Sequence, residues 1–147
     1  MSTVRDMIRR KGREKEVFSV RPEATVFDAL RLMEQHNVGA LMVMSGDHVA
    51  GILSERDCVR KMELEGRNAQ TARVNEIMTG KVINVDASQT LEECMTLMIE
   101  KNIRHLPVYE GSQLLGLISV RDVLKEIVDV QKSMLSQLER YITGGGR

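Results

Sequence analysis

A gapless internal repeat constrains the fold of this chain more than any other feature of its 147 residues. Residues 17–59 align with residues 82–124 at a constant offset of 65, with 13 identities in 43 positions. The identities include glycine, asparagine, serine and aspartate, and several other positions exchange one aliphatic residue for another. One copy of about 50 residues buries too little apolar surface to be stable as an isolated domain. We therefore expect two copies of one fold, fused into a single module.

The first half of each copy predicts a short strand followed by a helix. The strands are the apolar runs 17–20 and 82–85, and the helices that follow carry apolar residues at helical spacing. Thr25 and Thr90, each with an acid three residues later, predict N-terminal capping boxes. Asn37 and Asn102 mark the helix ends, because asparagine tolerates the left-handed conformation of a C-cap.

The second half of each copy predicts a hairpin and a second helix. The strand pairs are 39–44 with 48–53 and 103–109 with 113–118, and each pair is joined by a turn that contains glycine. The second helix follows from Ser54 or Ser119. Pro107 lies within a predicted strand, which indicates an edge position or a bulge. The fold class is therefore α+β, with two β-α-β-β-α repeats packed about a pseudo-two-fold axis.

The repeat also divides the chain into three segments. Residues 1–66 form the first repeat with its N-terminal lead, residues 67–130 the second repeat, and residues 131–147 a helix extension with a disordered tail. The extension has two candidate partners, a second subunit or the chain's own N-terminus, because an apolar stripe continues along it. The stripe consists of Val123, Ile127, Val130, Met134 and Leu138.

Composition excludes several classes of partner. Basic and acidic side chains balance at 21 each, which argues against a protein drawn to nucleic acid or to an acidic membrane. No window of 18 uncharged apolar residues is present, and the charged N-terminus, including residues 9–11, predicts a solvated face rather than a secretory signal. Cys58 and Cys94 lack a second ligand at metal-binding spacing, so we expect buried thiols, no metal and a cytoplasmic location.

One motif carries chemistry, and each copy contains it where a strand gives way to a helix. Glycine and two aliphatic residues precede Ser-x-Arg-Asp, at Gly51 to Asp57 and at Gly116 to Asp122. A helix N-terminus attracts phosphate through its unpaired N–H groups, and an aspartate can accept hydrogen bonds from the hydroxyls of a ribose. Ser-x-x-Asp is also an ordinary helix cap that needs no ligand. Two instances in register favour the ligand.

These motifs, the repeated element order and the stretches 74–85 and 102–122 resemble CBS domains, over about residues 1–130. The resemblance implies a cleft between the repeats that holds an adenosyl ligand, with AMP as the first candidate and NAD as the second. It also implies pairing of two modules into a dimer. By match, the nucleotide-binding residues are Val17, Phe18, Ala40, Leu41, Ser54, Arg56, Asp57, Val82, Ile83, Arg104, His105, Leu106, Pro107, Ser119, Arg121 and Asp122.

The two sites are not expected to be equivalent. Basic residues at the start of the strand after the first helix reach phosphate in some relatives, often across the module. Arg104 and His105 hold that place in the second copy, whereas the first copy has Gly39 and Ala40. The nucleotide held by Asp57 would then gain these two side chains. For His105, a phosphate contact and a purely structural role stay open.

The combined prediction is a homodimeric sensor of adenine nucleotides that acts by a ligand-dependent change of conformation. The sequence shows no nucleophile–base set or phosphate-binding loop of the GxxxxGK type, so we expect no catalytic residues and no enzymatic activity. The alternative is a protein–protein interaction module whose nucleotide sites are vestigial.

Overall fold

Two compact units make up the chain in the computed structural model, which describes residues 2–11 and 17–144. Residues 14–84 form the first-copy unit, and residues 1–13 with 85–147 form the second-copy unit. Each unit contains one copy of the repeat and one three-stranded sheet. The mixed α and β composition agrees with the predicted fold class.

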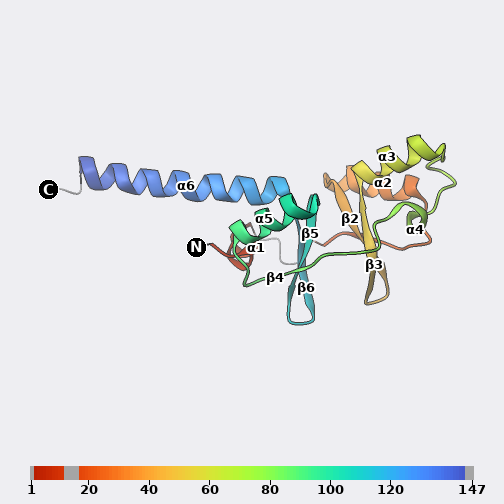
Figure 1. The fold of residues 1–147 in the computed structure, drawn as a ribbon, viewed down its shortest axis with the longest axis horizontal. Coiled ribbons are helices and arrows are strands. Elements are labelled where there is room, and N and C mark those ends of the chain that lie inside the picture. The colour runs from red at the N-terminus through yellow and green to blue at the C-terminus, as the bar shows by residue number, and fades with distance from the viewer. Residues whose placement is uncertain (1, 12–16, 145–147) are drawn as a thin grey trace. The chain divides into compact units, whose positions relative to one another are not determined.

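The first-copy unit has the predicted β-α-β-β-α order, followed by one additional short helix (Figure 1). Its sheet has the order β1-β2-β3, with β1 parallel to β2 and β2 antiparallel to β3. The elements are β1 (Ser19–Val20), α2 (Val26–His36), β2 (Ala40–Ser45), β3 (His48–Ser54), α3 (Glu55–Glu65) and α4 (Val74–Ile77).

The second-copy unit repeats this arrangement, with the order β4-β5-β6 and the same strand directions. A helix from the start of the chain joins it, and its last helix is much longer than α3. The elements are α1 (Val4–Lys11), β4 (Val85–Asp86), α5 (Leu91–Lys101), β5 (His105–Glu110), β6 (Gln113–Ser119) and α6 (Val120–Thr143).

The local signals in the sequence appear where they were predicted. Thr25 Oγ1 accepts from the Asp28 N–H at 3.1 Å, which is one of the two bonds of the predicted capping box, and Thr90 forms the full box with Glu93. Asn37 and Asn102 end their helices in the left-handed conformation, with φ of 53° and 52°. Gly46 and Gly111, both with a φ of 62°, stand in the hairpin turns, where a positive φ favours glycine.

The first strand of each copy is shorter than the predicted runs 17–20 and 82–85. Only Ser19–Val20 and Val85–Asp86 pair with the next strand. The two differ by one residue, and Pro107 explains the difference. In the first copy the Met42 N–H donates to the Phe18 carbonyl at 3.1 Å, whereas Pro107, at the equivalent position, has no N–H to donate.

Pro107 lies in β5, the central strand of its sheet, so the predicted edge position is wrong, whereas the predicted bulge is confirmed beside it. Strand β4 pairs with β5 only from Val108 onward, so Pro107 has no partner on that side of the strand. The register of β5 against β6 also shifts between Val108 and Tyr109, which is the mark of a bulge.

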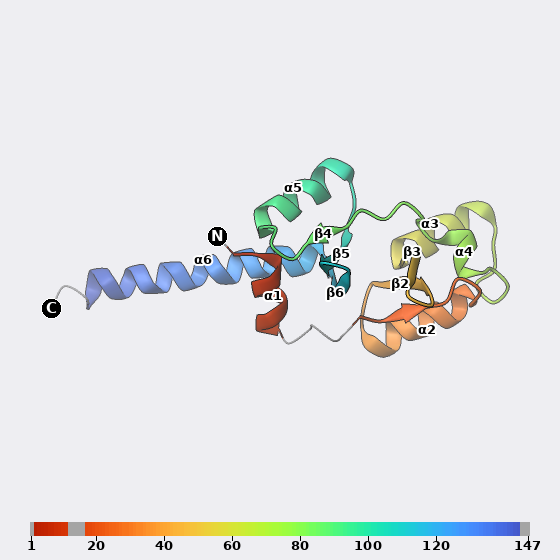
Figure 2. The same ribbon diagram turned by 90° about the horizontal axis from the view of Figure 1, so that it is seen from below.

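The N-terminal lead, which the sequence grouped with the first repeat, packs in the second-copy unit. Figure 2 shows α1 beside α5 and α6. The Val4 N–H donates to the Gln89 carbonyl and the Leu91 N–H to the Ser2 carbonyl. Helix α4 makes the equivalent bonds in the first-copy unit, from Val74 to Ala24 and from Val26 to Ala72. Each copy is thus completed by a segment that precedes the other copy in the sequence.

Buried side chains explain this packing. Val4, Met7 and Ile8 are buried on one face of α1, and Val74 and Ile77 are buried in the first-copy unit. The segments 3–8 and 73–78 are related at an offset of 70, since Val4 corresponds to Val74 and Met7 to Ile77. Arg9 and Arg10 are exposed, as predicted for the basic run 9–11, while the apolar residues of the same helix form a buried stripe that was not predicted.

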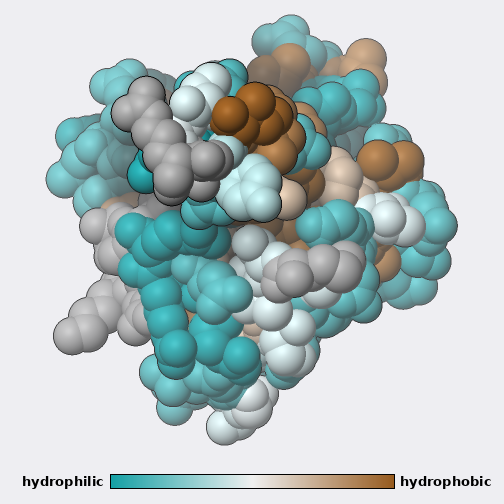
Figure 3. All heavy atoms as spheres, turned by 90° about the vertical axis from the view of Figure 1, so that its left-hand side faces the viewer, coloured by the Kyte–Doolittle hydropathy of each residue, from teal (hydrophilic) through white to brown (hydrophobic). Residues whose placement is uncertain are grey.

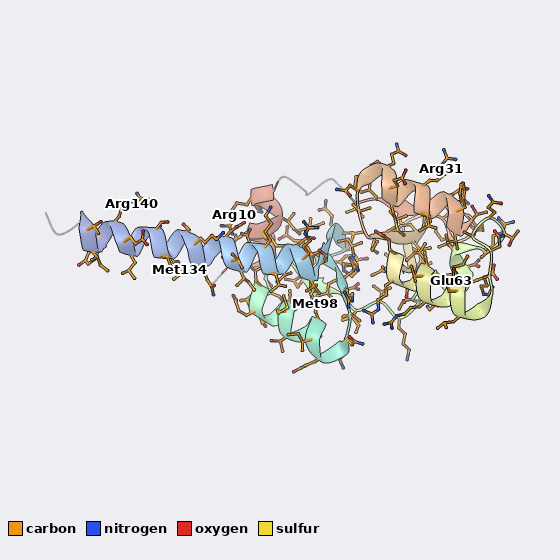
Figure 4. All side chains as sticks on the ribbon, turned by 90° about the horizontal axis from the view of Figure 1, so that it is seen from above. Arg10, Arg31, Glu63, Met98, Met134 and Arg140 are labelled. Carbon is orange, nitrogen blue, oxygen red and sulfur yellow. The ribbon has the colours of Figure 1, made fainter. Side chains whose placement is uncertain are left out.

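Helix α6 has 24 residues and divides into two halves with different surroundings. In its first half Glu126 is buried and pairs with Arg10 of α1, whose Nη2 lies 2.5 Å from the Glu126 Oε2 (Figure 4). Residues 131–143 are all exposed. The first half thus contacts the chain's own N-terminus, one of the two predicted partners. The tail 145–147 lies outside the described residues.

No helix within residues 2–11 and 17–144 is both long and apolar enough to cross a bilayer.

Candidate functional site

Two Ser–Asp corners with matching geometry stand at the strand-to-helix junctions. Ser54 ends β3 and caps α3, and Ser119 ends β6 and caps α6. In the first corner, Ser54 Oγ accepts from the Asp57 N–H at 3.1 Å, and Asp57 Oδ2 accepts from the Ser54 N–H at 3.3 Å. The corresponding distances in the second corner are 3.0 and 2.9 Å. All four side chains are half-buried.

The structure shows the helix-capping role of the motif, and the ligand-binding role stays a prediction. The pairs form complete capping boxes, as the ligand-free alternative predicts. The capping bonds occupy only Oδ2 of each aspartate. Oδ1 of Asp57 lies 3.8 Å from Lys61 Nζ, at a part-exposed position. A serine oxygen that accepts one bond still carries a hydrogen that can be donated to a phosphate oxygen.

In each unit the residue just before the central strand is hydrogen-bonded to the first residue of the helix at the corner. The Glu55 N–H donates to the Gly39 carbonyl and the Val120 N–H to the Arg104 carbonyl, each at 3.0 Å. Within the sheets Ala40 pairs with Ser54 and His105 pairs with Ser119. Arg104 and His105 therefore lie beside the corner of Asp122 in their own unit. The expectation that they serve the nucleotide of Asp57 stays a prediction, because it depends on how the two units are arranged.

The predicted adenine-lining residues fall into two groups. Val17, Phe18, Val82 and Ile83 precede the first strands and are half-buried, while Ala40, Leu41, Leu106 and Pro107 are buried. Leu41 lies in the apolar core of the first-copy unit and Leu106 is fully buried, so these two can meet a ligand through the backbone only. The Phe18 ring stacks on His36, with ring centroids 3.9 Å apart.

The two arginines of the motif differ in exposure. Arg56 is half-buried on α3 and Arg121 is exposed on α6, although they occupy equivalent positions.

One pair of residues near the corners was missed from the sequence. Lys61 follows Asp57 by four residues and approaches it, and its Nζ also donates to the Ile77 carbonyl of α4 at 2.7 Å. The equivalent position in the second copy is Glu126, which pairs with Arg10 of α1. The i, i+4 spacing on a helix was the signal that could have found this pair. The first corner thus has a cation one turn away and the second an anion.

The glycines of the motif, Gly51 and Gly116, face other segments of the chain itself. Thr79 pairs with Ile52 through two backbone hydrogen bonds, of 3.0 and 2.9 Å, and so approaches Gly51. A Cβ at Gly51 would lie 2.5 Å from the Thr79 carbonyl oxygen. A Cβ at Gly116 would meet the Ile8 side chain at 3.6 Å. These glycines admit segments of the chain itself, because glycine permits close backbone approach.

The two cysteines are buried and unpaired, as predicted. Burial raises the pKa of each thiol to about 11, and the acidic neighbours Asp57 and Glu93 act in the same direction. The thiols are therefore protonated near neutral pH. Among residues 2–11 and 17–144 no cluster of three or more His, Cys, Asp or Glu side chains could hold a metal ion.

Comparison with known proteins agrees with the repeat. The CBS domain matches residues 4–64 and 74–129. The chain is 36% identical over 151 residues to the CBS domain-containing protein CBSX3, mitochondrial, of Arabidopsis thaliana, covering 98% of this chain and 73% of that protein. It is 32% identical to the CBS domain-containing protein YhcV of Bacillus subtilis, covering 84% of each.

A solved structure shows the same fold. A protein with CBS domains from Burkholderia ambifaria superposes with a TM-score of 0.82 at 43% identity, over 87% of this chain and 95% of that one. The repeat, the paired corners and these similarities lead to one assignment. The chain belongs to the CBS-domain family and carries two CBS domains.

Proposed function

We propose that this chain is a regulatory module that binds an adenine nucleotide at its Ser–Asp corners and changes conformation when it does so. Pairs of CBS domains are regulatory modules that commonly bind adenine nucleotides or mediate interactions. The observation that carries the proposal is the matching geometry of the two corners, each with a hydroxyl and a carboxylate at a helix N-terminus. AMP is the first candidate ligand and NAD the second.

The chemistry of the first corner suits a ribose phosphate. The ribose hydroxyls are donors, and Asp57 Oδ1 is an acceptor that the capping bond leaves aside. The Ser54 hydroxyl and the first turn of α3 supply donors for a phosphate. Lys61 lies close enough to Asp57 to offset its negative charge when an anionic ligand approaches.

The second corner differs in the charges that surround it. Arg104 and His105 lie at the start of β5 beside Ser119, whereas Gly39 and Ala40 hold this place in the first copy. We therefore propose that the two corners differ in affinity. A ligand shifts the conformation only as far as its affinities for the two conformations differ, and a regulated partner protein would respond to that shift.

The test is a thermal unfolding panel with AMP, ATP, NAD and S-adenosylmethionine. A ligand at about 100 times its Kd adds about 2.7 kcal/mol to the free energy of unfolding. Asp57→Ala and Asp122→Ala each remove one carboxylate, so each variant is expected to lose the ligand-induced shift of its own corner.

Both substitutions also remove half of a capping box, which costs about 1 kcal/mol without any ligand. Glu93→Ala is the matched control, because Glu93 holds the same place in the box of α5, away from the corners. This control should lower the unligated melting temperature and keep the full ligand-induced shift. The proposal fails if millimolar concentrations of all four compounds leave the wild-type transition unchanged.

A second candidate is an interaction module whose nucleotide sites are vestigial. The observation that favours it is that both Ser–Asp pairs complete their own helix caps without a ligand. In that case Asp57→Ala and Asp122→Ala would leave partner binding insensitive to nucleotide. The absence of enzymatic activity and the cytoplasmic location stay predictions, and incubation of the purified chain with ATP or NAD tests the first of them.

A further inference from the structure

The exposed side of α6 carries a line of large apolar residues that the described part of the second-copy unit leaves 44–70% exposed. From residue 131 to 143 every position is exposed, and the helix runs on beyond the rest of its unit (Figure 1). Seen from the end where α6 stops, apolar atoms lie open at the surface beside polar ones (Figure 3). We call this line the outer face of α6. It consists of Leu124, Val128, Leu135, Leu138 and Ile142.

The spacing of the outer face is that of a coiled-coil seam. Val128, Leu135 and Ile142 follow one another at intervals of seven residues. Leu124 and Leu138 form a second series of the same period, with Gln131 midway between them. Two apolar series with a seven-residue period are the a and d positions of a heptad, which pack into the matching seam of a second helix.

An isolated helix end of this kind is marginal in water. Most helical stability in proteins comes from tertiary packing of the apolar face, and a segment of about 13 residues without such packing is close to the limit of stability. A row of exposed aliphatic residues also marks an interaction site. We therefore expect the outer face to pack against a second helix whose apolar residues have the same seven-residue period.

The flanking residues favour a second copy of the same helix, running antiparallel. On one side of the seam stand Lys125, Lys132 and Glu139, and on the other Ile127, Met134 and Tyr141. Antiparallel pairing places like sides together, so that Lys125 faces Glu139 of the second copy and the apolar flanks meet each other. Lys132 faces Lys132 of the second copy at the two-fold axis, which is the one like-charge contact between the charged flanks. Parallel pairing would instead set the charged flank against the apolar flank.

A membrane surface fits the same residues less well. Segment 124–143 holds three basic and three acidic side chains, and so lacks the cationic surplus of helices that lie on anionic lipid.

We propose that the outer face of α6 joins two copies of this chain as an antiparallel helix pair. The proposal does not depend on nucleotide binding. It assigns a self-association surface to a face of α6 that begins in the second repeat and continues beyond it.

Sedimentation equilibrium of the full chain tests the surface with a charge-matched pair of variants. Leu135→Glu/Leu138→Glu places two carboxylates on the outer face, and Ser133→Glu/Ser136→Glu places two on the remaining sides of the same helix turns. All four positions are exposed, so both variants are expected to keep the wild-type melting temperature of the repeats. The leucine variant should raise the dissociation constant at least ~10-fold and the serine variant should leave it unchanged.

Association through the repeats would persist in both variants, so the difference between them reports the helix face alone. Equal dissociation constants for the two variants, or a wild-type chain that stays monomeric, would overturn the proposal. It would also fail if sedimentation were unchanged while only the leucine variant lost binding to phosphatidylcholine–phosphatidylglycerol vesicles, since the face would then serve a membrane.

The direction of pairing has its own test. Lys125→Glu and Glu139→Lys should each weaken association, because each creates like-charge contacts in the antiparallel pair. The double variant should restore the wild-type dissociation constant. A double variant at least as weak as the two single variants would overturn the antiparallel arrangement.

Discussion

At the scale of single residues, Gly51 and Gly116 hold the same place in the two CBS domains but meet different neighbours. Gly51→Ala would force a Cβ to within 2.5 Å of the Thr79 carbonyl oxygen, so we expect a loss of about 1–3 kcal/mol in the free energy of unfolding. Gly116→Ala places its Cβ at 3.6 Å from Ile8, which is ordinary contact. It should leave the stability unchanged or raise it by about 0.5 kcal/mol.

Urea unfolding of the two variants measures both values. Neither glycine has a positive φ, so backbone strain does not differ between the two sites. Equal losses at the two positions would show that the requirement for glycine belongs to the motif itself, and not to the Thr79 backbone.

At the scale of elements, helices α1 and α4 dock through different chemistry at equivalent positions. Lys61 bonds to the Ile77 carbonyl at the end of α4, while Glu126 pairs with Arg10 of α1. The Glu126 side chain is 4% exposed, so Arg10→Ala leaves a buried carboxylate without its cation. We expect this variant to lose about 1–3 kcal/mol in the free energy of unfolding.

The double variant Arg10→Ala/Glu126→Gln should recover most of that loss, because the buried charge is gone. Thermal or urea unfolding of the two single variants and the double variant gives the coupling energy. Additive losses would contradict a direct interaction between these side chains.

At the scale of the whole molecule, the packing of α1 and α4 determines which unit a core mutation destabilises. Met7 and Ile77 are equivalent and buried, yet Met7 lies in the second-copy unit and Ile77 in the first-copy unit. Truncation of either to alanine should cost about 2–5 kcal/mol in its own unit. Hydrogen exchange should therefore rise mainly within 85–126 for Met7→Ala and within 17–79 for Ile77→Ala. Faster exchange in β1–β3 of Met7→Ala would contradict this assignment.

The limits of sequence reasoning follow from the same contacts. Helix caps, hairpin turns and the β-α-β-β-α order each depend on a few adjacent residues. The roles of Thr25, Asn37 and Gly46 could therefore be predicted from the local sequence. The docking of α1 depends on residues more than 80 positions away, which no local pattern records. The sequence does contain a signal for this docking, because residues 3–8 resemble residues 73–78 at an offset of 70. An alignment at the offset of 65, which relates the two repeats, does not bring these segments into register.

The candidate site shows the same division. Ser54, Asp57, Ser119 and Asp122 were found because the motif is contiguous along the chain. Lys61 and Glu126 were overlooked because their importance comes from partners in α4 and α1 that the motif does not contain. The one-residue difference between the starts of β1 and β4 was overlooked because Pro107 withholds a single N–H, an effect visible only once the neighbouring strand is known.

The packing of α1 in the second-copy unit has a consequence for the nascent chain. The first-copy unit is continuous in sequence, so everything it needs has left the ribosome shortly after residue 84. Helix α1 is made first, but its binding surface on residues 85–126 is made last. At roughly 5–20 residues per second, the apolar side of α1 waits several seconds or longer for its place, and during translation it is a surface on which a chaperone can act.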